Sequence, residues 1–273
     1  MNGKTLAHWL TLCWPLTFSA ACAAAEPAAA QAPGGVLNLL ASGAFSEVNV
    51  QLAPLYRKEL NLEVAASFGS SLPAVPTSVP RRLERGEAAD VVLTSRESLA
   101  KLAAQGLVVP ESQVDIMRSA LGLAVRSGSP IPAIATEAQT AAALLQAGSI
   151  AYSSSLSGAY YETAMLKKLR IEDQVLPKSR KISGEKVGAV VARGEAEIGM
   201  QQVSELLAVP GIAFVGKLPE SLQQYTVFSA GVSASAQHPE AARVWIAFLA
   251  RSPEAGRVLS RNGLEPMKSS GNP

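Results

Sequence analysis

The stretch VGAVVARGEAEIGMQQVSELL, Val187–Leu207, decides the fold because its hydrophobic pattern changes within one short segment. The valines of 187–191 recur at helical spacing, and Gly194 stands where a helix commonly ends in a left-handed residue. Ala196–Met200 is then an apolar run of strand length, and Ser204–Leu207 begins another helix. This order of helix, buried strand and helix predicts an α/β fold.

A polar pair, Gln201-Gln202, follows the expected strand. In an open α/β sheet the carboxyl ends of the strands face the ligand crevice, so these amides are placed to hydrogen-bond a ligand. Ser183-Gly184 and Glu185 mark the start of the preceding helix, and a helix start attracts anions. The alternative, that the glutamines only satisfy loop backbone, stays open at this point.

The composition is that of a globular protein. The chain has 273 residues, of which 48% are hydrophobic and 17% charged, enough for one large or two small domains. The net charge is +2 and the Lys and Arg residues are scattered along the chain, so no nucleic acid is expected as a partner. Aromatic residues make up 5%, which argues against an aromatic-lined sugar site or a base-stacking platform.

Residues 1–25 are typical of a cleaved signal peptide, which predicts a periplasmic protein. Lys4 precedes an apolar run over 10–21, and Ala23-Ala24-Ala25 offers a cleavage site. Pro15 interrupts a run that is too short to span a bilayer. A lipoprotein signal ending at Cys22 is the weaker alternative, since a large aliphatic residue is expected where Ser19 stands. Residues 26–35 are rich in Ala, Pro and Gly and are expected to be a linker.

Cysteine and histidine are nearly absent from the expected mature chain. Cys13 and Cys22 both lie in the leader, so no disulfide or thiolate nucleophile is expected. His238 is the one histidine outside the leader, so neither a metal site nor a cofactor is predicted.

Strand and helix patterns alternate along the rest of the chain, which predicts βαβ units and parallel pairing. The expected strands are 36–40, 62–68, 90–93, 119–126, 149–153, 196–200, 209–216 and 226–233. The expected helices are 45–60, 80–86, 95–105, 136–147, 160–169, 184–193, a helix beginning at 204, 239–251 and 253–262.

Four turns rich in small or hydroxyl-bearing residues lead into expected helices. They are Ala41–Ala44, the segment from Ser70-Ser71 to Thr77-Ser78, Ser154–Gly158 and Ser183-Gly184. Hydroxyls and free backbone N–H groups at helix starts can hold an anion. Each turn alone is better explained by capping, but four at corresponding positions favour a binding cleft.

The opening segment also resembles a known family. GEAEIG and SELL within it are similar to the second-lobe signature of periplasmic solute-binding proteins of the molybdate-binding type. VAASFGSS at Val64–Ser71 and RLERGEAADVVLTS at Arg82–Ser95 agree with it, and the resemblance covers about 36 to 266. It implies a two-lobed α/β periplasmic binding fold of type II, with two mixed sheets, flanking helices and a double crossover hinge. Lobe 1 would be 36–118 plus 227–273, and lobe 2 would be 119–226.

The resemblance places oxyanion contacts near Ala44, Ser71, Ser157 and Gly184, with Gln202 where the family has a tyrosine. This chain departs from the pattern, because Ala44 lacks a hydroxyl and the loop after Ser71 is longer. These departures favour a larger anion, with a small carboxylic acid preferred to molybdate. The candidate ligand-binding residues are Ser42, Gly43, Ala44, Ser70, Ser71, Thr77, Ser78, Arg82, Ser157, Gly184, Gln201 and Gln202.

Two functions fit these expectations. The preferred one is capture of a small anion by a monomeric carrier that delivers it to an ABC importer, with Arg82 and Lys186 as candidate cations. The alternative is a cofactor-free aconitate isomerase, because some bacterial aconitate isomerases have this fold. Its candidate proton-transfer groups are Glu47, Tyr160, Lys186 and Glu205. Molybdate or tungstate binding through rearranged contacts is a third, less favoured hypothesis. Hydrolase, P-loop, zinc-protease and dinucleotide motifs are missing from the sequence.

Overall fold

The computed structural model describes Met1 and residues 35–267. The signal peptide predicted over 1–25 and the linker predicted over 26–35 lie outside the described residues, apart from Met1 and Gly35. Within the described part, every helix is too short or too polar to cross a membrane.

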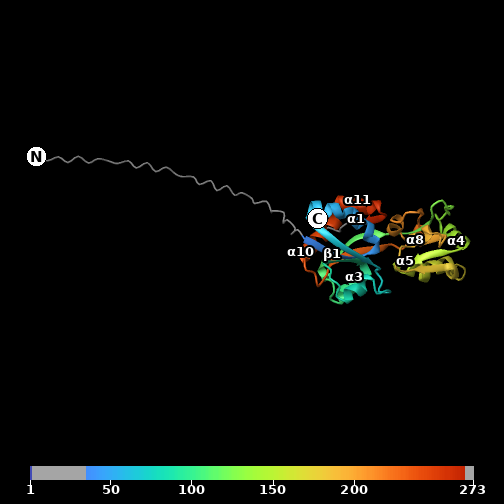
Figure 1. Cartoon of the computed structure of the whole chain (residues 1–273), viewed down its shortest axis with the longest axis horizontal. Helices are drawn as coiled ribbons and strands as arrows, with labels where there is room; N and C mark the ends of the chain where they lie inside the picture. Colours follow the sequence, from blue (N-terminus) through green and yellow to red (C-terminus); the bar gives the residue numbers. More distant parts are fainter. Residues whose placement is uncertain (2–34, 268–273) are drawn as a thin grey trace. The chain divides into compact units, whose positions relative to one another are not determined.

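The strands of residues 35–267 form two mixed sheets, as expected (Figure 1). Sheet A has the order β11-β4-β10-β3-β1-β2. Its strands are β1 Gly35–Ser42, β2 Leu62–Gly69, β3 Val91–Ser95, β4 Val114–Ser119, β10 Thr226–Val232 and β11 Leu264–Pro266. β1 pairs in parallel with β2 and β3, while β10 is antiparallel to β3 and β4.

Helices cover both faces of sheet A because its central strands are apolar on both sides. In β1, Leu37 and Leu39 belong to the core under α1 (Ser46–Leu55), α10 (Pro239–Arg251) and α11 (Pro253–Arg261). Leu40 belongs to a second core under α2 (Val79–Glu84) and α3 (Arg96–Ala104). Figure 1 shows α1 and α11 on the opposite side of the sheet from α3.

Sheet B has the order β7-β6-β8-β5-β9. Its strands are β5 Leu121–Arg126, β6 Ile150–Ser153, β7 Ser179–Ile182, β8 Ile198–Gln202 and β9 Ile212–Lys217. One face packs on α4 (Glu137–Gln146), α6 (Leu166–Leu169) and α7 (Glu172–Val175), and the other on α8 (Val187–Ala192). β8 continues directly into α9 (Val203–Leu207).

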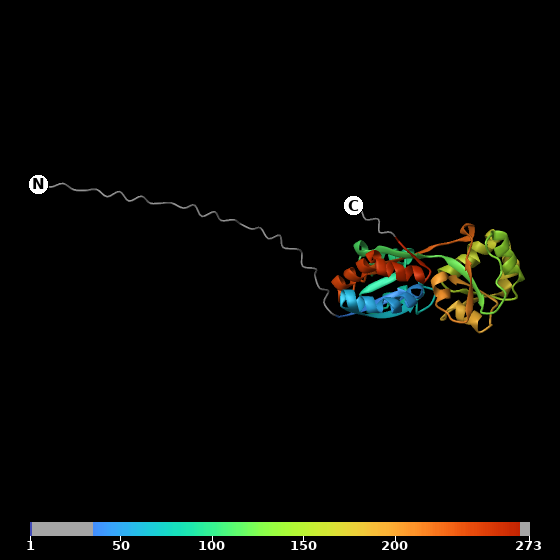
Figure 2. The ribbon, with the colours of Figure 1, turned by 90° about the horizontal axis from the view of Figure 1, so that it is seen from above.

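The chain passes between the sheets twice, from β4 to β5 and from β9 back to β10 (Figure 2). Gln223, in the returning segment, joins the two crossings. Its side-chain oxygen accepts from the N–H of Leu121 at 2.6 Å, and its amide nitrogen donates to the carbonyls of Leu121 and Leu218 at 3.1 and 3.2 Å. The two crossing segments are therefore bonded to each other.

Several expected boundaries shift, and some elements were missed. Gln201 and Gln202 are the last two residues of β8 rather than a pair beyond it. α8 begins at Val187, so Glu185 and Lys186 precede the helix. Ser157 and Gly158 lie inside α5 (Leu156–Tyr160), not in a loop. β4, β7, α7 and β11 were not predicted.

Candidate functional site

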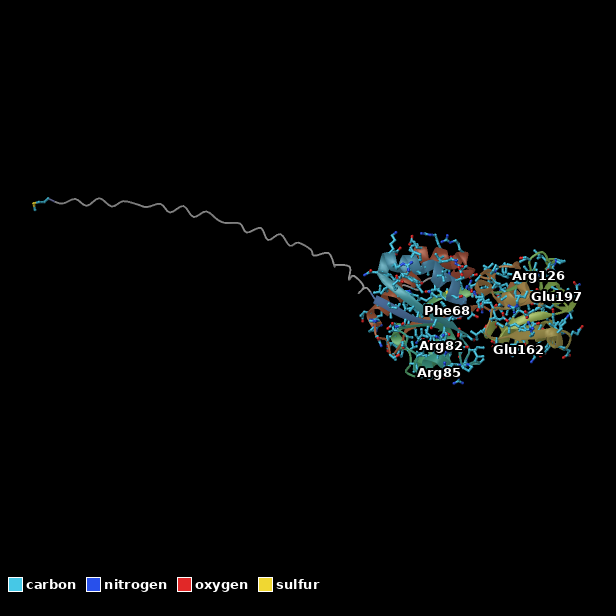
Figure 3. The ribbon with its side chains drawn as sticks, viewed as in Figure 1. Phe68, Arg82, Arg85, Arg126, Glu162 and Glu197 are labelled. Carbon is cyan, nitrogen blue, oxygen red and sulfur yellow. The ribbon has the colours of Figure 1, made fainter. Side chains whose placement is uncertain are left out.

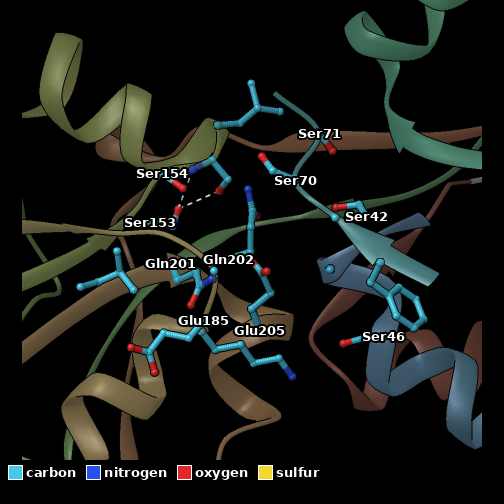
Figure 4. Close-up of a pocket in the computed structure, with 18 of the residues that line it drawn as sticks. Ser42, Ser46, Ser70, Ser71, Ser153, Ser154, Glu185, Gln201, Gln202 and Glu205 are labelled. Carbon is cyan, nitrogen blue, oxygen red and sulfur yellow. Dashed lines mark hydrogen bonds between the residues drawn. The ribbon is translucent and has the colours of Figure 1, made fainter. Parts of the chain in front are cut away.

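A pocket of about 360 Å³ is lined by residues from both sheets (Figure 4). Its volume lies in the range of small-molecule sites. The lining consists mainly of hydroxyl-bearing, small and amide side chains. They are Ser42, Gly43, Ser46, Phe68, Gly69, Ser70, Ser71, Val75, Thr77, Ser153, Ser154, Ser155, Leu156, Ile182, Gly184, Glu185, Lys186, Gln201, Gln202, Glu205, Thr226 and Phe228.

The loop after β2 forms one side of the pocket. A β-carbon on Gly69 would stand 2.4 Å from the Thr77 carbonyl oxygen, so only glycine lets the loop fold back over the end of β2. The loop is closed by the Val79 N–H, which donates to the Ser70 carbonyl at 2.9 Å. Ser71 is buried and accepts from the Ser95 N–H at 3.3 Å. The loop is therefore held at both ends, and the hydroxyls of Ser70, Ser71 and Thr77 line the pocket.

Serines at the end of β6 form the opposite side. The Ser153 hydroxyl lies 2.7 Å from the hydroxyls of both Ser155 and Ser157, and Ser154 lies 2.9 Å from Ser183. Gly158 makes the tight turn possible, because a β-carbon there would lie 1.6 Å from the Ser153 carbonyl oxygen. Each hydroxyl can donate one proton, so this cluster can offer hydrogen bonds to an anion.

The two glutamines at the end of β8 are buried and fixed by different partners. The side-chain oxygen of Gln201 accepts from the Val187 N–H at 2.9 Å, which leaves its NH₂ group as the donor on the pocket side. The Gln202 NH₂ group donates to the Thr226 hydroxyl at 2.8 Å. Gln202 therefore links sheet B to the first residue of β10 in sheet A.

Three charged residues line the pocket. Glu185 is paired with Arg193, with nitrogen–oxygen distances of 2.9 and 3.1 Å. Lys186 belongs to none of the ion pairs among the described residues, and it is the one Lys or Arg of the lining within 35–267. Burial raises the pKa of Glu205 to about 7, while Lys186 and a hydrogen bond from Gln201 lower it. The pocket thus combines one cation with a carboxyl group that titrates near neutral pH.

Most of the candidate residues line this one pocket. They are Ser42, Gly43, Ser70, Ser71, Thr77, Gly184, Lys186, Gln201, Gln202 and Glu205. Six other candidates are not part of the lining, namely Ala44, Glu47, Ser78, Arg82, Ser157 and Tyr160. Ser157 lies behind the lining, where its hydroxyl supports Ser153.

Two of the residues outside the lining have other partners. Arg82 pairs with Glu87 and donates to the Phe68 carbonyl at 3.2 Å, so it anchors the end of β2 (Figure 3). The Tyr160 hydroxyl donates to the Leu222 carbonyl at 3.0 Å.

Some of the lining residues were not predicted from the sequence. Ser46 follows the first turn, and Thr226 opens β10. Thr226 could have been recognised by its hydroxyl, because it is the first residue of a strand that returns to sheet A. Ser153, the last residue of β6, was assigned to a strand and not weighed as a pocket residue. Residues 35–267 contain no group of three or more His, Asp or Glu that could hold a metal ion.

Comparison with known proteins shows the family to which the chain belongs. Residues 37–265 match the family model described as bacterial extracellular solute-binding protein. Aconitate isomerase from a Pseudomonas species is 39% identical over 252 residues, which cover 92% of this chain and 96% of that protein.

Solved structures of periplasmic binding proteins share the fold. The periplasmic molybdate-binding protein of Azotobacter vinelandii superposes with a TM-score of 0.63 at 20% identity, over 84% of this chain and 98% of that one. The sulfate-binding protein of Mycobacterium tuberculosis gives a TM-score of 0.66 at 17% identity, over 86% of this chain and 88% of that one. The chain therefore belongs to the bacterial extracellular solute-binding proteins and has their two-lobed periplasmic binding fold.

Proposed function

We propose that this chain captures a small carboxylic acid in the pocket between its sheets. The observation that carries the proposal is the lining itself, in which hydroxyl and amide donors from both sheets surround one lysine. Neutral donors can hold an anion, and Lys186 can neutralise one carboxylate. A cavity of about 360 Å³ also has room for an organic acid larger than a single tetrahedral oxyanion.

The two sheets serve as the cores of two lobes that close on the ligand. We assign 36–118 plus 227–273 to lobe 1 and 119–226 to lobe 2, since the crossings from β4 to β5 and from β9 to β10 fall near these limits. Rotation about two short crossings is a typical hinge closure around a ligand. The family supports a periplasmic location and, for a carrier, delivery of the ligand to an ABC importer. We propose that the carrier acts as a monomer.

Binding is tested by replacing the pocket cation. Lys186→Gln removes the positive charge but keeps a polar side chain, so trans-aconitate should bind at least about tenfold more weakly, measured by titration calorimetry. Lys101→Gln makes the same change on the exposed face of α3, outside the pocket, and should bind like the unaltered chain. Equal affinity of the Lys186 variant would contradict the proposed role of the lysine.

A second function, interconversion of cis- and trans-aconitate, is favoured by a specific observation. Glu205 brings to the pocket a carboxyl group with a pKa of about 7, which a carrier does not need. A group with such a pKa can both accept and donate a proton at neutral pH. The Pseudomonas relative, named an aconitate isomerase, covers nearly the whole chain, and it points to aconitate as the acid.

Mixing the purified chain with trans-aconitate and following the solution by proton NMR separates the two functions. Protein-dependent appearance of the cis isomer is expected for an isomerase. Binding of trans-aconitate without conversion to the cis isomer would support the carrier function and exclude the isomerase function. Molybdate in a parallel titration tests the third hypothesis, since a ligand at 100 times its dissociation constant stabilises the folded state by about 2.7 kcal/mol.

A further inference from the structure

Glu205 occupies an unusual position for an acidic residue. It lies in the first turn of α9, immediately after β8, and its side chain reaches the pocket next to η1 (Gly43–Phe45). A β-carbon on Gly43 would stand 3.1 Å from the Glu205 carboxyl oxygen, so the glycine leaves room for this carboxyl group. Figure 4 shows Glu205 beside Gln202 on one side of the pocket, with Ser70 and Ser71 on another.

The surroundings of Glu205 leave its proton free to move. No ion pair among the described residues includes it, and the charged groups that share the pocket with it are Lys186 and Glu185. Glu185 is already held by Arg193. Gln201 lies on the Glu205 side of the pocket and lowers the pKa of its carboxyl group, and the oxygen of Gln201 is fixed by the Val187 N–H. Lys186 therefore favours the ionised form of the Glu205 carboxyl group without forming an ion pair with it.

We infer that Glu205 is the group that moves the proton in the isomerisation. The inference rests on the second function proposed above. The ionised carboxylate takes a proton from the methylene carbon next to the substrate double bond. The electrons of that C–H bond form the new double bond, and those of the old double bond shift to its far carbon. Glu205 returns the proton to that carbon, so no oxidant, reductant or second reactant is consumed.

Lys186 and the serines act on the substrate during this step. Charge that builds up in the allylic system spreads onto the attached carboxylate. A cation and hydroxyl donors at that carboxylate stabilise the charge, which lowers the barrier to removing the proton. Ser155 and Lys186 lie in the same lining as Glu205, so the pocket can both hold the acid and accept its proton.

The test compares the unaltered chain with Glu205→Gln and Glu205→Asp, using proton NMR for turnover and calorimetry for binding of trans-aconitate. Glu205→Gln should lower kcat by about 10²–10⁴-fold while still binding the acid, which also shows that it is folded. Glu205→Asp should recover part of the rate. Glu97→Gln makes the same chemical change on the exposed face of α3 and should leave kcat unchanged.

The pH profile supplies a readout that a structural role would not move. For the unaltered chain kcat/KM should rise with pH and reach half its maximum near pH 7, because the ionised carboxylate is the active form. Two results would overturn the inference but not the isomerase function. One is a kcat of Glu205→Gln within about tenfold of that of the unaltered chain, and the other is a flat profile between about pH 5.5 and about pH 8.5. Absence of turnover in the unaltered chain would overturn the isomerase function, and the inference with it.

Discussion

At the scale of single residues, Glu205 should also make the stability of the fold depend on pH. Burial raises its pKa from an ordinary 4.5 to about 7, so the folded chain holds a proton that the unfolded chain has already lost. The stabilising effect of that proton is complete below about pH 4.5 and is lost as the pH rises to about 7. Ionisation of this carboxyl group therefore destabilises the fold above neutral pH.

Glu205→Gln should accordingly unfold like the unaltered chain at about pH 5 and be more stable at about pH 8. The difference in the free energy of unfolding should be up to about 3 kcal/mol. Urea denaturation at the two pH values measures it, with Glu97→Gln as the control. A difference between the two chains that stays constant with pH would show that the Glu205 carboxyl group is not dehydrated.

The sequence predicted many of the pocket residues but not their chemistry. Ser70, Ser71 and Gly184 could be found because small and hydroxyl-bearing residues before helices are readable patterns. The pKa of Glu205 could not be read, since it depends on burial against Gly43, which is more than 150 positions away in the chain. Ala44 and Glu47 stand close in sequence to pocket residues, but neither lines the pocket.

At the scale of elements, the turn from β6 into α5 depends on Gly158. A β-carbon at 1.6 Å from the Ser153 carbonyl oxygen meets backbone, so no side chain can move aside. Gly158→Ala should therefore lower the free energy of unfolding by more than about 2 kcal/mol. Urea denaturation tests it against Gly256→Ala in α11, where the nearest atom lies at 3.8 Å.

Gly256→Ala should be neutral or should stabilise the chain by about 0.5–1 kcal/mol, because alanine is the better helix former. Similar stabilities of the two alanine variants would mean that the β6–α5 turn can rearrange. In that case the positions of Ser153 and Ser155 in the pocket would not depend on the glycine.

The elements that the sequence did not predict share a physical reason. Within residues 35–267, β7, Ser179–Ile182, pairs only with β6. It keeps Arg180 and Lys181 exposed, so it lacks an apolar run. β4 mixes Asp115 and Arg118 with buried Ile116 and Met117. Pairing with neighbouring strands makes these segments extended, and pairing is not a local property. The strongly apolar strands β1, β3 and β6 were predicted within a few residues.

At the scale of the whole molecule, alternation of strands and helices predicted the class of fold, but only the resemblance implied two crossings between sheets. The reason is that β4 and β5 follow one another in sequence yet belong to different sheets. Ala120, between them, carries no pattern that marks the change. Contacts between residues that are distant in sequence, such as those of Gln223 with Leu121, define the place where the chain crosses.

The last prediction concerns Gln223, which joins the two crossings without lining the pocket. Its three hydrogen bonds, to the Leu121 N–H and to the carbonyls of Leu121 and Leu218, tie the segments about which the lobes would turn. Gln223→Ala leaves these partly buried backbone groups without their partner, which should lower the free energy of unfolding by about 1–3 kcal/mol. The neighbouring variant Gln224→Ala changes an exposed side chain and should have no such effect.

The same pair of variants tests the link between the hinge and ligand capture. If the crossings must move together for the pocket to close, Gln223→Ala should also bind trans-aconitate more weakly, although every pocket residue is intact. Small-angle scattering with and without the acid should then show a smaller contraction for Gln223→Ala than for Gln224→Ala. Reduced stability with unchanged affinity and contraction would instead mean that Gln223 only supports the fold, and that closure does not depend on its hydrogen bonds.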